Sequence, residues 1–222
     1  MRLIWGSYMS LKKYKTVLGD EVFKAEYEIN KSKFIAHVKQ IEDEDSARDF
    51  LVMLKKKYYD ATHNCSAWVL GVDGSKQKSN DDGEPGGTAG NPILETIKKN
   101  ELVNTMIVVT RYFGGIKLGA GGLIRAYSHT AALGLSASKI VTMTPMQKLS
   151  ITVNYNLLAS VENWLRNKQI RVENTDYAEN VTLTILLLPE EVESRLTELT
   201  DLTSANFSHT LEEELLIAVE NK

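Results

Sequence analysis

Two glycine-rich segments carry most of the residues that could do chemistry. Nine of the 14 glycines lie between Gly83 and Gly122, whereas ordinary turns would scatter them. The segments read DDGEPGGTAG over residues 81–90 and GGIKLGAGG over residues 114–122. Such clustering indicates backbone that needs positive φ angles or close approach to another group. Each segment precedes a predicted helix, whose free N–H groups would make a candidate anion cradle. The alternative is tight turns with close helix packing.

The standard nucleotide-binding signatures do not fit the second segment. A P-loop needs Gly-Lys followed by Ser or Thr, and here Leu118 follows Lys117. The dinucleotide pattern needs a third glycine at the position of Ile124. The sequence therefore argues against a P-loop NTPase and against a Rossmann dehydrogenase.

The charges around these segments are mixed. Arg111, Lys117 and Arg125 flank the second segment, and Asp82 and Glu84 lie in the first. Two carboxylates about 4 Å apart repel by roughly 4 kcal/mol at an effective dielectric constant of 20, so converging carboxylates predict a cation between them. That cation would be the Arg111 guanidinium or a Mg²⁺ ion held by Asp82 and Glu84. Carboxylates that point into water or cap turns would predict no site.

His63 and Cys65 would face the same side of a strand. The chemical hypothesis is a Cys–His nucleophile pair, or His63 as a general acid or base. The alternative is a small buried cysteine beside a polar histidine, since no third group to orient the pair is evident. Zinc is not predicted, because one cysteine and scattered histidines do not supply four ligands.

Aromatic side chains near the second segment are candidates for stacking on nucleic-acid bases. Tyr112 and Phe113 open this segment, and Tyr127 follows it. Trp68 could stack as well, but it lies in a buried strand pattern and is predicted to belong to the core.

The elements that must position these residues follow from the apolar spacing. In the first part of the chain, the predicted strands are 22–29, 33–41, 65–72 and 103–110, and the predicted helices are 42–58, about 91–99 and about 123–138. Residues 73–91 are predicted as one polar loop, with Asn91 as N-cap and Pro92 as the first helical residue. Met1–Lys13 shows no clear pattern, and Met9 is an alternative start.

The pattern restarts after a predicted boundary at residues 141–145. Strand 147–154 precedes a helix, the strand pair 169–175 and 180–188 follows, Pro189 opens another helix, and a last strand lies within 205–219. The order β-α-β-β-α-β is the ferredoxin-like arrangement.

Composition and charge limit the class of protein. The 222 residues are 43% hydrophobic and 25% charged, an ordinary globular balance. No apolar run approaches the ~20 residues of a membrane-spanning helix, and the single cysteine predicts a reducing, cytoplasmic location. Residues 1–140 carry a net charge of +4 and residues 141–222 a net charge of −7. A polyanionic partner is therefore expected to bind the first part.

Three motifs resemble the YigZ/IMPACT family: Ala61-Thr62-His63, DDGEPGGTAGNP over residues 81–92, and VVTRYFGGIKLGAGGLIRAY over residues 108–127. The resemblance runs from about residue 14 to the end and implies an α+β protein of two domains. Residues 14–141 would resemble the second domain of a small-subunit ribosomal protein and domain IV of elongation factor G. Residues 146–220 would resemble the ferredoxin-like last domain of elongation factor G, in agreement with the independent element pattern.

The resemblance also implies site residues. The family's signature positions in this chain are His63, Asp81, Asp82, Glu84, Pro85, Thr88, Gly90, Arg111, Tyr112, Gly114, Gly115, Lys117, Gly119, Gly121, Gly122 and Tyr127. The expected ligand- or phosphate-binding residues are Thr88, Arg111, Tyr112, Gly115, Lys117 and Arg125. His63 is the candidate catalytic residue, and Asp82 and Glu84 are the candidate metal ligands.

Three functions remain as hypotheses. The first is an RNA- or ribosome-binding protein related to translation, in which the basic residues meet phosphates. The second is a Mg²⁺-dependent enzyme acting on a phosphorylated or nucleotide-like small molecule. The third is a protein-interaction regulator of translation, because the best-described members of the family are eukaryotic regulators of translation. The sequence leaves the natural ligand and the oligomeric state open.

Overall fold

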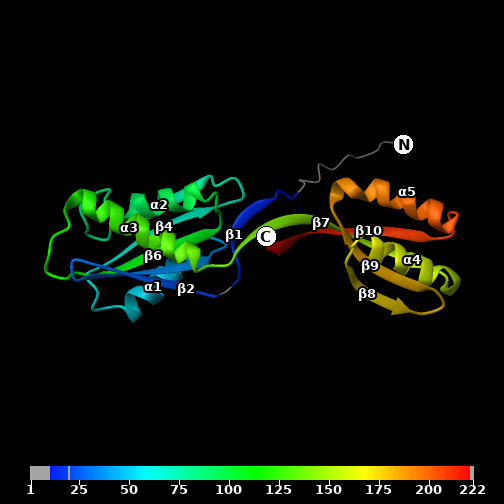
Figure 1. Ribbon diagram of the computed structural model, residues 1–222, viewed down its shortest axis with the longest axis horizontal. Helices are drawn as coiled ribbons and strands as arrows, with labels where there is room; N and C mark the ends of the chain where they lie inside the picture. The colour runs from blue at the N-terminus through cyan, green and yellow to red at the C-terminus, as the bar shows by residue number, and fades with distance from the viewer. Residues whose placement is uncertain (1–10, 20, 221–222) are drawn as a thin grey trace. The chain divides into compact units, whose positions relative to one another are not determined.

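The computed structural model describes residues 11–19 and 21–220, and the proposed alternative start at Met9 lies outside them. Over this part of the chain the protein is a mixed α+β structure with two antiparallel sheets and five α-helices (Figure 1). It divides into two compact units. Among the described residues, the N-terminal unit comprises residues 13–143 and 218–220, and the C-terminal unit is built on residues 144–217.

The N-terminal unit is built around one five-stranded sheet of order β2-β3-β6-β4-β5. Its elements in chain order are β1 (Tyr14–Val17), β2 (Phe23–Ile29), β3 (Ser32–Gln40), α1 (Glu44–Lys57), β4 (His63–Leu70), β5 (Lys76–Asn80), α2 (Gly90–Lys99), β6 (Thr105–Tyr112) and α3 (Gly119–Ser136). The short strand β1 pairs with β7 instead of joining this sheet.

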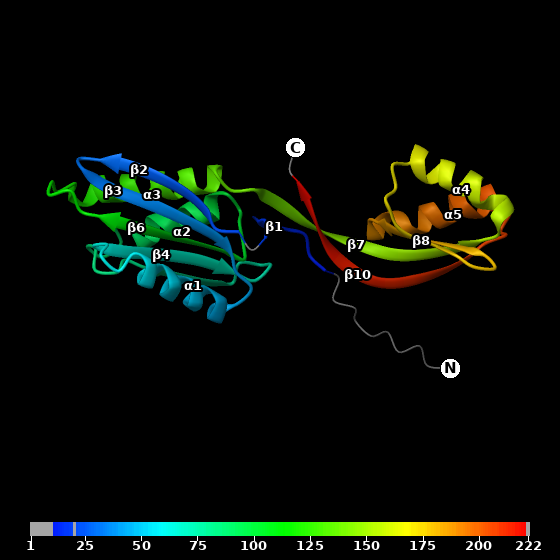
Figure 2. The same cartoon turned by 90° about the horizontal axis from the view of Figure 1, so that it is seen from below.

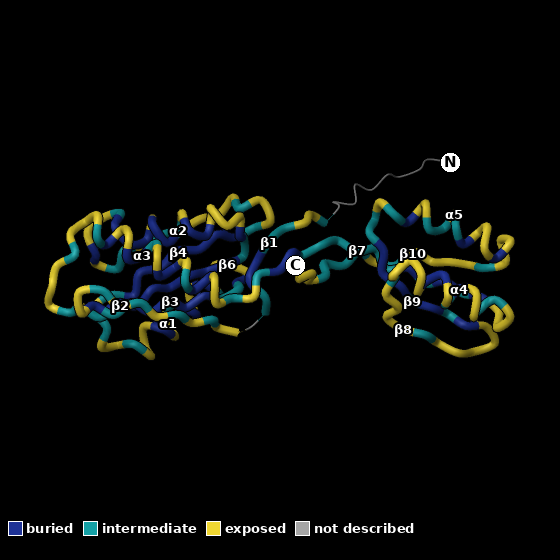
Figure 3. Tube along the Cα trace, viewed as in Figure 1, coloured by how far each residue is buried: buried dark blue, intermediate teal, exposed yellow. Residues whose placement is uncertain are grey.

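Helices cover both faces of this sheet (Figure 2). Helices α2 and α3 pack on one face, where Ile93, Ile97 and Tyr127 join the larger core cluster. Helix α1 packs on the other face and buries Phe50 and Leu54 against a second cluster. The central strands are therefore buried on both sides, as the dark segments of Figure 3 show.

Local chemistry explains where α1 forms. Asp43 is the N-cap, and its carboxylate accepts a hydrogen bond from the Ser46 N–H at 2.7 Å. The Ser46 hydroxyl in turn accepts a hydrogen bond from the Asp43 N–H, which completes a capping box. Acidic residues occupy the first turn and three lysines the last, which complements the helix dipole. The predicted apolar face is confirmed, since Ala47, Phe50 and Leu54 are all buried.

The main differences from the prediction in the N-terminal unit are one missed strand and the starts of two helices. The polar loop 73–91 contains the edge strand β5, whose residues KQKSN show no apolar alternation because both of its faces are largely exposed. Helix α2 begins at Gly90 with Ala89 at the N-cap, so the predicted Asn91 cap is wrong. Helix α3 begins at Gly119 rather than residue 123, which places three glycines of the second segment in its first turn.

The C-terminal unit has the predicted order β-α-β-β-α-β. Its elements are β7 (Ile140–Val153), α4 (Tyr155–Asn167), β8 (Val172–Tyr177), β9 (Val181–Leu187), a 3₁₀ turn at Pro189–Glu191, α5 (Val192–Thr203) and β10 (Ser208–Glu220). Strand β9 pairs antiparallel with both β7 and β8, and β10 pairs with β7. Both helices contribute to one apolar cluster, which includes Leu149, Ile151 and Ile185.

The predicted break at residues 141–145 lies inside a strand. Strand β7 runs without interruption from Ile140 to Val153, pairing first with β1 and then with β9. Pro145 lies between the part of β7 that pairs with β1 and the part that pairs with β9. Among the described residues, no helix is both long enough and apolar enough to cross a membrane.

Candidate functional site

A pocket of about 400 Å³ lies between the two glycine-rich segments of the N-terminal unit. Glu84 comes from the first segment, and Lys117 and the first turn of α3 come from the second. The ends of β4 and β6 place His63 and Arg111 in the pocket wall, because these two residues are direct partners in the sheet. The expectation that the two segments lie side by side is therefore confirmed.

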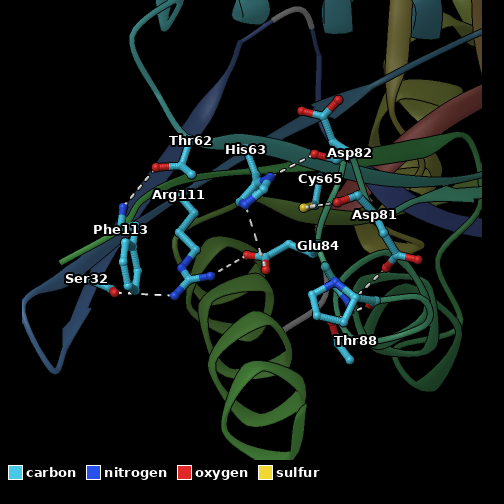
Figure 4. A network of polar contacts seen from close by, with 12 residues as sticks. Ser32, Thr62, His63, Cys65, Asp81, Asp82, Glu84, Thr88, Arg111 and Phe113 are labelled. Atoms are coloured by element: carbon cyan, nitrogen blue, oxygen red, sulfur yellow. Dashed lines mark hydrogen bonds and ion pairs between the residues drawn. The ribbon is translucent and has the colours of Figure 1, made fainter. Parts of the chain in front are cut away.

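Glu84 and Arg111 form a buried ion pair at this pocket (Figure 4). Arg111 Nη1 lies 2.6 Å from Glu84 Oε1, and the two side chains are 6% and 3% exposed. The same carboxylate oxygen accepts a hydrogen bond from the Tyr127 hydroxyl at 2.7 Å. The guanidinium also lies over the rings of Phe34 and Phe113, at 5.3 and 5.4 Å from their centroids. Arg111 is thus the cation beside Glu84, and it acts inside the protein rather than on its surface.

His63 faces the second oxygen of the same carboxylate. Its Nδ1 lies 2.8 Å from the Asp82 carbonyl oxygen, which can only accept, so Nδ1 carries the proton. In the neutral ring, Nε2 is then an acceptor, and it lies 3.9 Å from Glu84 Oε2. The imidazole is 19% exposed. A hydroxyl group or a water molecule could therefore contact both His63 Nε2 and Glu84 Oε2, which is the arrangement that a general base requires.

The other two acidic residues of the first segment have structural partners. Asp82 accepts a hydrogen bond from the Asn64 N–H at 2.7 Å and pairs with Lys55 at 2.5 Å. Asp81 accepts hydrogen bonds from the N–H groups of residues 87, 89 and 90, and so caps α2 from outside the helix. Burial alone would raise the pKa of Asp81, but these three backbone hydrogen bonds outweigh it and hold the pKa below its usual value.

The arrangement does not favour the predicted Mg²⁺ site. In Figure 4 the carboxylate of Asp82 points away from that of Glu84, and each is already paired with a basic side chain. Within the described ranges, no group of three or more His, Cys, Asp and Glu side chains is placed to hold a metal ion.

Cys65 does not have the properties of a nucleophile. Its thiol is buried, donates to the Asp81 carbonyl oxygen at 2.9 Å and contacts the Tyr127 hydroxyl at 3.3 Å. Burial raises the pKa of the thiol to about 12, so the thiolate is absent near neutral pH. Cys65 and the fully buried Tyr127 are core residues, which leaves Tyr127 unable to stack on a base.

The second segment supplies the exposed part of the pocket. Lys117 has no ion-pair partner among the described residues, and no side chain caps the N-terminus of α3 behind it. Phe113 is 45% exposed. Gly115 adopts φ +83°, which a side chain would strain, and so supports the turn that presents Lys117.

Three other predicted residues lie outside the pocket. The Thr88 hydroxyl donates to the Pro85 carbonyl oxygen at 2.6 Å and closes the turn before α2. Tyr112 follows Arg111 on the strand and therefore points to the opposite face, where its hydroxyl donates to Asp60 at 2.9 Å. Arg125 lines a different hollow, beside Tyr27.

Two residues that help to build the site, Ser32 and Thr62, could not be recognised as functional from the sequence. The Ser32 hydroxyl accepts from the Gly114 N–H at 3.1 Å and contacts Arg111 Nη2 at 3.5 Å. Thr62 accepts from the Phe113 N–H at 3.0 Å and so fixes the start of the second segment. Ser32 falls in a predicted turn far from both glycine segments, and only the sheet pairing brings it to the site.

Fold and site together describe a two-unit α+β protein whose N-terminal unit holds a polar pocket between two glycine-rich segments. Residues 30–135 match the model of the Impact N-terminal domain, and residues 151–206 match a domain of unknown function, DUF1949. The chain is 43% identical over 194 residues to IMPACT family member YvyE of Bacillus subtilis, covering 87% of this chain and 88% of that protein.

Two further similarities cover most of the chain. IMPACT family member YigZ of Escherichia coli is 34% identical over 176 residues, which are 78% of this chain and 86% of that protein. A crystal structure of a hypothetical protein is similar with a TM-score of 0.58 and 29% identity, covering 91% of this chain and 98% of the other. The chain therefore belongs to the IMPACT family, as its three motifs predicted.

Proposed function

We propose that this protein binds RNA, free or in the ribosome, in a role related to translation, and that the pocket between the glycine segments is the contact site. The observation that carries the proposal is the grouping of Lys117, the uncapped N-terminus of α3 and the exposed Phe113 ring around one pocket. A cation and helix N–H groups suit phosphate, and an exposed ring suits a base.

The fold supports the same proposal by analogy. The element order and the strand order β10-β7-β9-β8 favour a ferredoxin-like C-terminal domain. We infer that the N-terminal unit corresponds to the ribosomal-protein-like and elongation-factor-like domain that the family resemblance implies. A cytoplasmic location is part of the proposal and is supported by the one cysteine of the chain, which is free and buried.

The geometry changes the expected phosphate contacts. Arg111 is withdrawn into the Glu84 ion pair and Arg125 lies at another hollow, so Lys117 is the basic side chain available at the pocket. Arg111 is assigned instead to positioning, because it fixes Glu84 and packs under Phe113.

Co-sedimentation with ribosomes and binding to total cellular RNA test this proposal, at salt concentrations of about 50–300 mM because phosphate contacts weaken with salt. We expect the Lys117→Ala variant to bind less than the parent protein. The matched control is Lys99→Ala, which removes an exposed lysine at the far end of α2. Absence of binding at the lowest salt would contradict the proposal. A stoichiometric protein partner that survives nuclease treatment would instead favour the protein-interaction regulator.

One observation favours a second candidate function, an enzyme acting on a phosphorylated small molecule. His63 has its Nδ1 held by a carbonyl oxygen while Nε2 faces the pocket beside Glu84, as expected of a general base. Mg²⁺ is not needed for this role. The test is release of product from phosphate esters by the parent protein and by His63→Gln, and lack of turnover in both would exclude it.

A further inference from the structure

We infer that the pocket holds a single nucleoside phosphate, with the phosphate at Lys117 and α3 and a ribose hydroxyl between His63 and Glu84. This inference rests on the proposed function and names the chemical group that the site would recognise. It follows from three features of the pocket: its size, the two ends of its polar lining, and its exposed ring.

The size limits the ligand. At about 400 Å³, the pocket lies near the lower end of the range of ligand sites, about 300–1,000 Å³, which suits one nucleotide rather than several. An extended strand would need a long groove with basic residues along it. Of the basic residues flanking the second segment, Lys117 lines this pocket together with the paired Arg111.

One end of the pocket is suited to an anion. Lys117 precedes α3 directly, and this 18-residue helix has neither a side-chain cap nor an acidic residue in its first turn. Its first N–H groups are therefore available to phosphate oxygens. Arg111 also lines the pocket, but its guanidinium is paired with Glu84 and the Nε atom that lacks a partner among the described residues is itself buried, so Lys117 and the helix N–H groups are what this end offers to an anion.

The other end is suited to a hydroxyl group. Glu84 Oε1 is occupied by Arg111 and Tyr127, whereas Oε2 faces His63 Nε2 at 3.9 Å. A hydroxyl group between these two acceptor atoms can donate its proton to one of them. A second phosphate would be disfavoured here because Glu84 Oε2 is an acceptor and donates no hydrogen bond to phosphate oxygens.

The ring completes the match. Phe113 is 45% exposed at the pocket and lies over the Arg111 guanidinium at 5.4 Å, which fixes the orientation of its face. A nucleobase can stack, without sequence preference, on the face of this ring that the guanidinium does not cover. The three subsites together, for phosphate, hydroxyl and base, define a nucleoside phosphate.

Calorimetric titration of the full chain with AMP, with adenosine and with 2′,3′-dideoxy-AMP tests this inference. We expect AMP to bind at least tenfold more tightly than adenosine, and the Lys117→Ala variant to lose most of that difference. Dideoxy-AMP should bind about 3–10-fold more weakly than AMP, which corresponds to one neutral hydrogen bond. In His63→Gln that second difference should disappear. Lys99→Ala should behave as the parent protein does.

Two results would overturn the inference: equal affinity for AMP and adenosine, or equal weakening of AMP by Lys99→Ala and Lys117→Ala. Circular dichroism of each variant excludes unfolding as the cause of a loss. Near-native spectra are expected because both lysines and His63 lie outside the buried ion pair.

RNA probes separate this inference from the proposed function. A short 5′-phosphorylated RNA is compared with the same sequence closed into a circle, each competing with AMP. Competition by the linear RNA alone would identify a strand end as the source of the nucleotide. Binding of AMP with no binding of either RNA would contradict the proposed function and retain the pocket inference. Binding of both RNAs without AMP binding would support the proposed function and contradict the pocket inference.

Discussion

Glu84 receives hydrogen bonds from two side chains, those of Arg111 and Tyr127, and faces a third in His63. The ionised carboxylate is 3% exposed, and its charge is compensated chiefly by the guanidinium. An uncompensated buried charge is costly, so this pair is expected to matter for folding as well as for the site.

Replacing Arg111 with methionine tests this energetic role. The variant leaves Glu84 buried without its cation, and we expect the free energy of unfolding to fall by about 3–5 kcal/mol. Denaturant unfolding measures the change. The double variant Glu84→Gln, Arg111→Met removes both charges and should recover a large part of the loss. A change below about 1 kcal/mol in the single variant would mean that solvent reaches the carboxylate.

Cys65 gives a second prediction at the residue scale. Burial raises the pKa of its thiol to about 12, so at pH 8 the native protein should resist alkylation by iodoacetamide. After unfolding in denaturant the same thiol should react at the rate of a free cysteine. Mass spectrometry measures the extent of alkylation in the native and in the unfolded protein. Rapid alkylation of the native protein would restore the hypothesis that Cys65 is a nucleophile.

At the scale of elements, several glycines are needed because the backbone of another segment lies too close for a Cβ atom. A Cβ on Gly114 would lie 2.0 Å from the carbonyl carbon of Lys31, at the turn between β2 and β3. One on Gly90 would lie 2.6 Å from the backbone of Asn80. Both contacts are with backbone atoms of another segment, the β2–β3 turn for Gly114 and strand β5 for Gly90, so no shift of a side chain could relieve them.

Gly114→Ala should therefore destabilise the protein strongly, by more than the ~1 kcal/mol that is typical of point mutations in general. Gly86→Ala is the matched control, because a Cβ there meets nothing within 4 Å and the residue has no positive φ. Thermal unfolding of the two variants gives the comparison. Similar melting temperatures for both would show that the turn between β2 and β3 yields easily.

The packing of α1 on β3 predicts a pH dependence. His37 is 2% exposed, its ring is tilted against that of Tyr58 with the centroids 4.9 Å apart, and its Nε2 has no partner among the described residues. Burial, followed by the nearby charges of Lys24 and Lys57, lowers its pKa from 6.5 to about 4. The native ring is therefore neutral over a range in which the unfolded ring is protonated.

The sign follows from proton uptake. Above pH 6.5 the His37 ring is neutral in both the native and the unfolded state, and its contribution to the free energy of unfolding is fully present. As the pH falls from 6.5 towards 4, the unfolded state alone binds the proton, and the free energy of unfolding drops by up to about 3 kcal/mol. The His37→Leu variant should lose this part of the pH dependence. Equal slopes for the parent and the variant between pH 6.5 and 4 would contradict the assigned burial.

The elements that the sequence predicted well are those with strong periodicity. The two strands before α1, the apolar face of α1 and the β-α-β-β-α-β order needed only local spacing. Strand β5 was missed because KQKSN is polar on both faces, and its identity as a strand depends on pairing with β4. The cap of α2 was misplaced because the acceptor is Asp81, nine residues before Gly90.

The sequence predicted which residues form the candidate site, but not which of them interact with one another. The glycine clusters and the family motifs identified His63, Glu84, Arg111 and Lys117, which line one pocket. The partner of each charge could not be read locally, since Glu84 and Arg111 are 27 residues apart. Pairing of β4 with β6 decides that Arg111 neutralises Glu84, and this pairing makes Arg111 a positioning residue instead of a phosphate contact.

At the scale of the whole molecule, the charges of the two parts of the chain have opposite signs. Residues 1–140 carry a net +4 and residues 141–222 a net −7. Several basic side chains of the N-terminal unit are already paired, among them Lys15, Lys55 and Arg111. The positive charge that remains for a polyanion is therefore small, and the acidic C-terminal unit adds none.

This balance predicts how RNA binding should depend on salt. If the pocket engages one terminal phosphate through Lys117 and α3, few counterions are released, and the logarithm of affinity should fall with the logarithm of salt by a slope of only about 0.7–1.4, as for one or two contacts to a single strand. A broad basic surface would give a slope several times larger. Filter binding of a 5′-phosphorylated RNA across a salt series measures it. A steep slope that Lys117→Ala leaves unchanged would place the RNA on a different surface, because the pocket alone cannot neutralise that many phosphates.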